Sequence, residues 1–127
     1  MIGQLQHEVV DLGVYDSHPV DYPDIAASVA ELVGSGQVER GILIGGTGLG
    51  MCIAANKVAG VRAVPCHDVT TAEFSRLHTD SNVLCLSASL LGNRLMRHIV
   101  DTWLKTAFEG GRHQSRLDKI AQLERQP

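Results

Sequence analysis

The segment best suited to chemistry is a glycine-rich turn at residues 45–50, which separates an apolar run at 42–44 from a helix-compatible segment starting near Met51. Its glycines are Gly45, Gly46, Gly48 and Gly50. Glycine leaves backbone N–H groups uncovered, and such a turn before a helix can bind a phosphate or a developing oxyanion. The spacing matches neither a Walker A loop nor the dinucleotide-binding Gly-x-Gly-x-x-Gly pattern. A tight turn without a ligand is an equally good interpretation of this segment alone.

A histidine and two arginines supply further side chains suited to acid–base and anion chemistry. His78 follows a segment with helical character, and an imidazole with an ordinary pKa of about 6.5 can move protons near neutral pH. A structural role beside the carbonyls of the helix end explains the same position. Arg112 and Arg116 are four residues apart, so a helix would place them on one face, where the pair can hold a phosphate. Two solvated surface charges are the alternative.

The surrounding sequence predicts alternating strands and helices that would position these residues. Strands are expected at residues 8–12, 42–44, 61–64 and 83–86, and helices at 21–34, 51–57, 68–78, 91–107 and from 117 to the C-terminal region. This alternation is typical of an α/β fold, a Rossmann-like doubly wound parallel sheet with helices on both faces. Ligands of such sheets bind beyond the carboxyl ends of the strands. One rim should therefore carry Thr47, His67, Asp68 and Ser87–Ser89.

Individual residues refine this prediction. The run at 83–86 is apolar throughout and indicates a buried strand, with Cys66 and Cys85 as small buried residues. The segment 91–107 is expected to be the longest helix, with an apolar stripe of Leu95, Ile99 and Trp103. The final helix presents a narrow stripe of Leu117, Ile120 and Ala121. It is expected to pack either on a partner subunit or on its own core.

Composition restricts the class of protein. A chain of 127 residues with 44% hydrophobic and 20% charged residues is typical of one globular domain. A net charge of −3 gives no basic footprint for nucleic acid, and the longest apolar run is too short to span a membrane. The three cysteines lack metal-ligand spacing, and the N-terminus lacks the features of a signal peptide. We therefore expect a cytoplasmic protein without a metal.

A series of motifs occurs in a recognisable order along the chain. They are Ile53-Ala-Ala-Asn-Lys57, Gly60-Val-Arg-Ala63, Cys66-His-Asp68, Ser75-Arg-Leu-His-Thr-Asp-Ser-Asn-Val-Leu-Cys-Leu86 and Glu109-Gly-Gly-Arg-His-Gln-Ser-Arg116. Together they resemble the ribose-5-phosphate isomerase B family, which includes the galactose-6-phosphate isomerase subunits. The resemblance implies that residues 1–127 form a single sugar-phosphate isomerase-like domain. It also implies that the reaction needs no cofactor.

The resemblance implies a role for each matching residue. His78 would open the sugar ring by moving a proton between the ring oxygen and the anomeric hydroxyl, and Thr47 would bond a sugar hydroxyl. Asn56 would lie near the sugar, although a structural role at the end of a helix is as good an explanation. Arg112 and Arg116 would hold the phosphate. The loop amides that would stabilise the enediolate belong to Gly46, Gly48, Leu49 and Gly50.

The chain departs from the family at the base that carries a proton between C1 and C2. The family places a cysteine at the position of Gly45, and one branch places a glutamate at the position of Met51. Neither residue of this chain can transfer a proton. Cys52 lies one residue further on, and we hypothesise that it substitutes as the base, with a buried helix cysteine as the alternative.

Two further departures concern binding and the N-terminus. Ser89 stands where the family often has an arginine that contributes to phosphate binding. The family's first strand and most of its first helix have no counterpart before Glu8, so we expect either a misplaced start or a truncated domain that repacks. The missing unit would remove an acid–histidine pair that helps to bind the sugar.

The resemblance also implies partners. The family's active site lies at a subunit interface, so a homodimer or tetramer is expected. The leading hypothesis is an aldose–ketose isomerase acting on ribose 5-phosphate and ribulose 5-phosphate. The alternative is a catalytically impaired, sugar-phosphate-binding subunit that completes the site of a related hetero-subunit, as in galactose-6-phosphate isomerase. A tetrose or hexose phosphate is a further possible substrate.

Overall fold

The computed structural model of the chain describes Val10 and residues 21–125. The strand expected at 8–12 and the loop that follows it lie outside the described residues, apart from Val10, which belongs to no helix or strand. The described part contains eight elements in the order α1–β1–α2–β2–α3–β3–α4–α5. This order confirms the predicted alternation from residue 21 onward.

A three-stranded parallel sheet forms the centre of the fold. Its strands are β1 (Gly41–Gly45), β2 (Ala63–Pro65) and β3 (Val83–Ser87), in the spatial order β1–β3–β2. Leu43 pairs with Cys85 and Val64 with Leu84. All five residues of β3 are buried, as expected of an apolar strand covered on both faces. Pro65 ends the short edge strand β2, where a missing N–H costs least.

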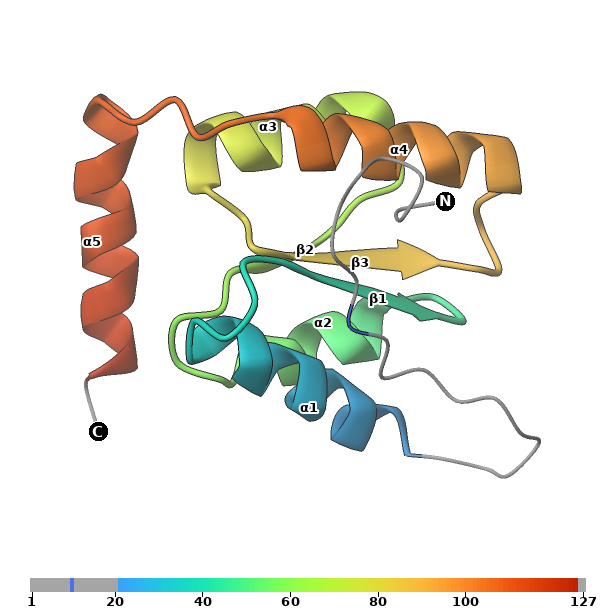
Figure 1. The fold of residues 1–127 in the computed structure, drawn as a ribbon, viewed down its shortest axis with the longest axis horizontal. Coiled ribbons are helices and arrows are strands. Elements are labelled where there is room, and N and C mark those ends of the chain that lie inside the picture. The colour runs from blue at the N-terminus through green and yellow to red at the C-terminus, as the bar shows by residue number, and fades with distance from the viewer. Residues whose placement is uncertain (1–9, 11–20, 126–127) are drawn as a thin grey trace.

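Helices cover both faces of this sheet, so the doubly wound α/β prediction is confirmed (Figure 1). The helices α1 (Tyr22–Gly34) and α2 (Leu49–Ala55) lie on one face, and α3 (Val69–Thr79) and α4 (Asn93–Lys105) lie on the other. Side chains alternate along the strands, so the core divides into two layers. One layer contains Leu43, Ala63, Val83 and Cys85, and the other contains Leu84, Leu86, Ile99 and Trp103.

Several predicted element boundaries were wrong. The helix α2 begins at Leu49, two residues before Met51, and ends at Ala55. The helix α4 is shorter than the predicted 91–107, because Thr106 has an extended backbone, and it is not the longest: α1, α4 and α5 each have 13 residues. Ile99 and Trp103 are fully buried as predicted, whereas Leu95, in the first turn of α4, is 39% exposed.

The last helix, α5 (Arg112–Glu124), stands apart from both layers and crosses one end of the domain (Figure 1). Leu117 is buried, but Ile120 and Leu123 are 46% and 65% exposed. A groove of about 770 Å³ separates the inner side of α5 from residues 56–64 and is lined mainly by apolar side chains. The predicted apolar stripe of this helix is therefore only partly covered by its own chain.

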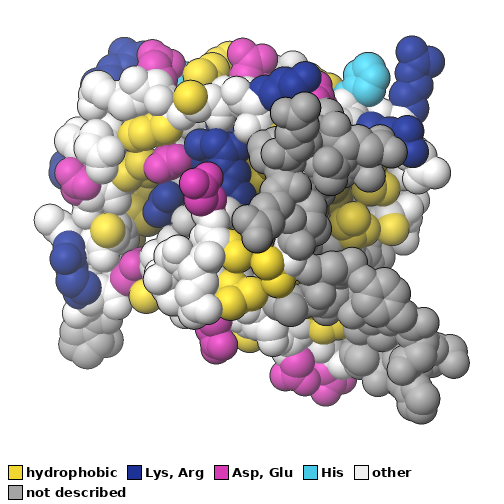
Figure 2. Space-filling model, viewed as in Figure 1, with side chains coloured by type: hydrophobic (Ala, Val, Ile, Leu, Met, Phe, Trp, Pro, Cys, Tyr) yellow, Lys and Arg dark blue, Asp and Glu magenta, His cyan; other side chains and the backbone are white. Residues whose placement is uncertain are grey.

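The surface agrees with the composition. On the face shown in Figure 2, acidic and basic side chains are interspersed and form no patch of one sign. Among the described residues, no helix is both long and apolar enough to cross a membrane.

Candidate active site

The glycine-rich turn lies at the carboxyl end of β1, as predicted. Gly48 has φ of +78°, and a Cβ atom there would lie 2.8 Å from the carbonyl oxygen of Leu86. Only glycine fits, because it accepts positive φ and leaves room for the backbone of β3. Among the described residues, the N–H groups of Gly46 and Gly48 meet no acceptor. The turn therefore offers free donors to an anion.

Hydrogen bonds join this turn to the loop after β3. The Ser87 hydroxyl donates to the carbonyl oxygen of Gly46 at 2.7 Å, and the N–H of Ser89 donates to the same oxygen at 3.0 Å. Thr47 is exposed beside them, and its hydroxyl accepts from the N–H of Leu49 at 3.3 Å. The predicted rim is therefore confirmed at these residues.

The third loop of the rim follows β2, and its residue Asp68 has a structural role. Its carboxylate accepts a hydrogen bond of 2.6 Å from the N–H of Thr71 and caps α3, which starts close to the predicted residue 68. Hydrogen bonds from Thr71 lower the pKa of Asp68, because they stabilise the charged form. His67 is exposed next to it and has no hydrogen bond among the described residues.

Gly45 and Met51 are in contact across the turn. A Cβ atom added to Gly45 would lie 2.8 Å from the Met51 sulfur. Met51 is 6% exposed, so its side chain fills the space beside residue 45. The resemblance places a proton carrier at position 45 or at position 51. In this chain the Met51 side chain fills the space beside Gly45, and neither residue carries an ionisable group.

Cys52 does not face the glycine-rich turn. Its sulfur donates toward the carbonyl oxygen of Ala63 at 3.5 Å and lies in the core with Cys85. A hydrogen bond from Cys85 lowers the pKa of the Cys52 thiol, while burial opposes this shift. The hypothesis that Cys52 is the base is not supported by this position, because helix geometry turns the thiol toward the sheet.

Asn56 is turned away from the rim, and its contacts favour the structural role given as the alternative to a place near the sugar. Its side-chain amide donates to the carbonyl oxygen of Ala63 at 2.9 Å and accepts from the N–H of Ala63 at 2.8 Å. Because α2 runs antiparallel to the strands, its last turn reaches the amino-terminal end of β2. The Asn56 side chain therefore connects the end of α2 to β2 through two hydrogen bonds. Asn82 also has a structural role, since its side-chain oxygen accepts from the N–H of Arg62 at 2.7 Å and its side-chain nitrogen donates to the carbonyl oxygen of Gly60 at 2.9 Å.

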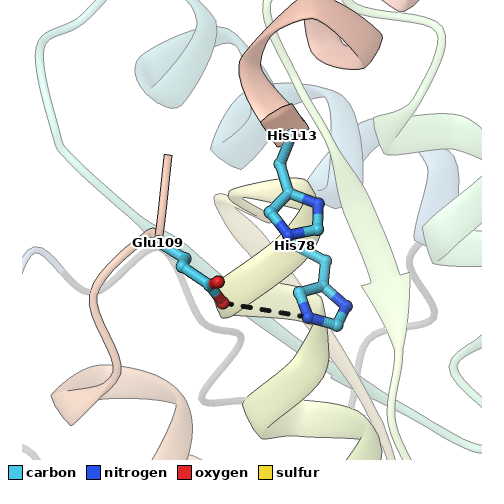
Figure 3. A group of neighbouring side chains, drawn as sticks. All are labelled: His78, Glu109 and His113. Carbon is cyan, nitrogen blue, oxygen red and sulfur yellow. Dashed lines mark ion pairs between the residues drawn. The ribbon is translucent and has the colours of Figure 1, made fainter. Parts of the chain in front are cut away.

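His78 lies at the opposite end of the sheet, on the last turn of α3. Its Nε2 is 3.9 Å from Oε2 of Glu109, and its ring stacks on that of His113 at a centroid distance of 4.4 Å (Figure 3). The ring of Phe74 lies next to that of His78, with a distance of 5.0 Å between the ring centroids. The side chain of His78 is 40% exposed, so it is held by neighbouring rings yet open to solvent.

The two arginines lie beside this histidine cluster at the start of α5. Gly110 and Gly111 precede them with φ of +75° and +58°, which lets the chain turn sharply into the helix. Arg112 and Arg116 are both exposed on α5, four residues apart, as predicted. Among the described residues neither has an ion-pair partner. Two guanidinium groups are therefore available to an anion.

The predicted site residues thus form two groups rather than one. The glycine-rich turn lies beyond the carboxyl ends of the strands, whereas His78, Arg112 and Arg116 lie at the amino-terminal end. The 11-residue helix α3 spans the distance between these ends, which is about 16 Å at 1.5 Å per residue. One chain therefore does not bring the two groups together.

Sequence reasoning did not single out three residues that the structure places at these sites. Glu109 and His113 lie next to His78. Their presence in the same motif as the two arginines was the sequence feature that could have indicated them. Tyr22 lies against the glycine-rich turn, because a Cβ added to Gly50 would be 2.5 Å from its hydroxyl. No local pattern links Tyr22 to residue 50, since the contact joins α1 to α2.

Comparison with known proteins gives consistent results. The family profile described as "Ribose/Galactose Isomerase" matches residues 1–120. The ribose-5-phosphate isomerase B of Escherichia coli is 49% identical over 117 residues, which are 92% of this chain and 78% of that protein.

Solved structures agree with the sequence matches. Ribose-5-phosphate isomerase B of Clostridium thermocellum has a TM-score of 0.94 and 48% identity, covering 98% of this chain and 84% of that one. The Mycoplasma genitalium enzyme of the same name, solved with bound ribulose 5-phosphate, has a TM-score of 0.92 and 46% identity, covering 99% of this chain and 84% of that one.

Proposed function

Since the chain belongs to the ribose/galactose isomerase family, we propose that it takes part in aldose–ketose isomerisation of a phosphorylated sugar, with ribose 5-phosphate and ribulose 5-phosphate as the substrate pair. The observation that carries this proposal is the close match to ribose-5-phosphate isomerases B, one of them holding ribulose 5-phosphate. The predicted cytoplasmic location fits such a metabolic role.

Each group of site residues supports one part of the reaction. His78, exposed and close to Glu109, moves the proton that opens the sugar ring. Arg112 and Arg116 hold the phosphate, because their exposed guanidinium groups match its geometry and charge. The N–H groups of Gly46 and Gly48, which meet no acceptor in the described part of the chain, stabilise the enediolate, and Thr47 bonds a sugar hydroxyl. The reaction only moves protons between carbon and oxygen, so it requires no redox cofactor.

Two subunits are needed to assemble this site. The glycine-rich turn of one chain and His78 of the same chain lie about 16 Å apart along α3, too far to contact neighbouring atoms of one sugar. A partner subunit, oriented so that its α3 and α5 face the turn, closes that distance. The exposed Ile120 and Leu123 of α5 support this arrangement, because an apolar helix face is stabilised by a partner. A symmetric dimer forms two such sites.

The test is to incubate the purified chain with ribose 5-phosphate, follow formation of the ketose, and measure the oligomeric state by light scattering. Turnover by a dimer or tetramer, lost in His78→Asn, is expected. Cys52→Ala is the matched control and should retain the parent's turnover, because its sulfur faces the core. A fully active monomer contradicts the two-subunit site, and turnover that survives His78→Asn contradicts the assignment of His78.

The contact between Gly45 and Met51 favours a second candidate function. With no ionisable side chain at either position, the turn offers amides but no base for the C1–C2 proton transfer. In this alternative the chain binds the sugar phosphate and completes the site of a related subunit that supplies the base. Binding of ribose 5-phosphate without turnover by the isolated chain, with activity appearing after a related isomerase subunit is mixed in, would favour it.

A further inference from the structure

Three side chains with metal-binding atoms meet where α3 ends and α5 begins (Figure 3). One potential ligand atom each from His78, Glu109 and His113 lies within 4.8 Å of the others. The N–H of Glu109 donates to the carbonyl oxygen of Leu77 at 3.1 Å, so the loop before α5 is held against α3. The three residues are therefore brought together by the fold rather than by a flexible side chain alone.

His113 provides independent evidence that this cluster accommodates a ligand. The residue is 5% exposed, and its Nε2 is buried without a hydrogen-bond partner among the described residues. A buried nitrogen with no partner is unfavourable, and a ligand that bonds it removes the cost. Burial, followed by the charge of His78, lowers the pKa of His113. A lower pKa favours the neutral imidazole, which is the form that binds metals.

We propose that His78, Glu109 and His113 form a binding site for a divalent transition-metal ion, with Zn²⁺ as the best fit. Two imidazoles and a carboxylate are a known ligand set for zinc sites that keep a fourth position open. Imidazole nitrogen favours zinc, copper and nickel, whereas magnesium and calcium prefer oxygen ligands. The ion therefore differs in class from the magnesium that many phosphate-binding enzymes use.

The geometry requires only side-chain movement. Zinc with bonds of about 2.0–2.2 Å has tetrahedral ligand atoms about 3.3–3.5 Å apart. Nε2 of His78 and Oε2 of Glu109 are 3.9 Å apart, and both side chains are partly exposed, at 40% and 55%. The His78 and His113 rings are now nearly parallel, at 17°. Metal binding turns the His78 ring out of this stack, so that the two nitrogen lone pairs converge.

Neighbouring charges set the strength of the site. Arg112 and Arg116 act on His113 in the direction that lowers its pKa, so they also repel a metal cation. Glu109 acts in the opposite direction and supplies the negative charge that a cation needs. Replacing Glu109 by glutamine should therefore weaken the metal both by removing a ligand and by leaving the arginines unopposed.

The consequence for catalysis rests on the proposed function. A metal on His78 occupies the lone pair that would accept a proton from the sugar. Zinc then inhibits isomerisation, and the inhibition is relieved by a chelator.

The test is calorimetric titration of tag-free, metal-stripped protein with Zn²⁺, with Mg²⁺ as the negative probe. The parent should bind one Zn²⁺ per chain and no Mg²⁺. Glu109→Gln and His113→Asn should each weaken zinc at least about tenfold, as loss even of an outer-shell partner typically does. His98→Gln, an exposed histidine on α4, is the matched control and should leave zinc affinity unchanged. Circular dichroism checks that each variant is folded.

The outcomes separate this site from the proposed function. Zinc affinity that is unchanged in a folded Glu109→Gln protein overturns the metal site, even if the chain is an active isomerase. Zinc affinity that depends on Glu109 and His113 supports the site, even if ribose 5-phosphate is not turned over. Equal loss in His98→Gln would mean that zinc binds surface histidines unspecifically, which also overturns the proposal.

Discussion

Placing a cysteine at residue 45 tests both the packing of the turn and the reason that it lacks a base. A Cβ at this position lies 2.8 Å from the Met51 sulfur and 3.7 Å from its Cγ, whereas comfortable contacts lie at about 3.5–4.0 Å. Met51 is 6% exposed and has little room to retreat. Gly45→Cys should therefore overpack the turn at a cost of about 1–3 kcal/mol.

The second change removes the obstruction. Met51→Ala alone leaves a cavity and should cost about 2–5 kcal/mol. In the double variant the cysteine occupies part of the space vacated by the methionine, so the two costs should not add. We expect the double variant to be more stable than the sum of the single variants by about 0.5–3 kcal/mol, the range for residues in contact.

Urea unfolding of the parent, the two single variants and the double variant measures this coupling. Costs that add to within about 0.5 kcal/mol would show that residues 45 and 51 do not share space, and would refute the packing argument. The same four proteins are then assayed with ribose 5-phosphate. A thiol placed to transfer the C1–C2 proton should raise turnover roughly 10²–10⁴-fold over Met51→Ala. Coupling without a gain in turnover would leave the contact standing and reject residue 45 as the base position.

Three further predictions follow from individual contacts. Asn56→Ala should lower the free energy of unfolding by about 1–3 kcal/mol and leave kcat/KM unchanged, because the side-chain amide makes two hydrogen bonds with the backbone of Ala63. Lost substrate affinity without lost stability would instead place Asn56 at the sugar. The folded-state pKa of Asp68 is lowered, so its stabilisation is present above the unfolded pKa of about 3.9 and is lost as the pH falls through the lower folded value. Thermal melts from neutral to acid pH should show this loss in the parent and not in Asp68→Asn, and parallel curves would contradict it. Arg112→Lys keeps the charge but not the planar fork, so KM for ribose 5-phosphate should rise roughly tenfold with little change in kcat, as steady-state kinetics would reveal.

The fold class was predictable because it depends on local patterns. The continuous apolar run of β3 required cover on both faces, and the structure buries all five of its residues. Asp68 predicted the start of α3, since a short acidic side chain reaches the N–H groups of a first turn. The expected strand at 8–12 stays a prediction because it lies outside the described residues. The boundaries of α2 and α4 were less predictable, because the ends of helices depend on backbone conformations such as that of Gly48.

Among the functional residues, too, features set by local sequence were predictable and those set by packing between elements were not. The types and spacing of Gly46, Gly48, Arg112 and Arg116 predicted anion-binding groups, because backbone donors and paired guanidinium groups act through local geometry. For Asn56 and Cys52 the sequence left a functional and a structural role open. The contacts of both side chains with Ala63, which depend on the packing of α2 on β2, favour the structural role.

The sequence by itself determined the order of strands and helices, the free donors of the glycine-rich turn and the two arginines on one helix face. Only the tertiary structure decided which of these groups are neighbours. It put His78 beside Glu109 and His113, filled the space at Gly45 with Met51, and set the turn and the histidine at opposite ends of α3. The physical reason is that periodicity and turn chemistry act over a few residues, whereas these contacts depend on how whole helices pack against the sheet.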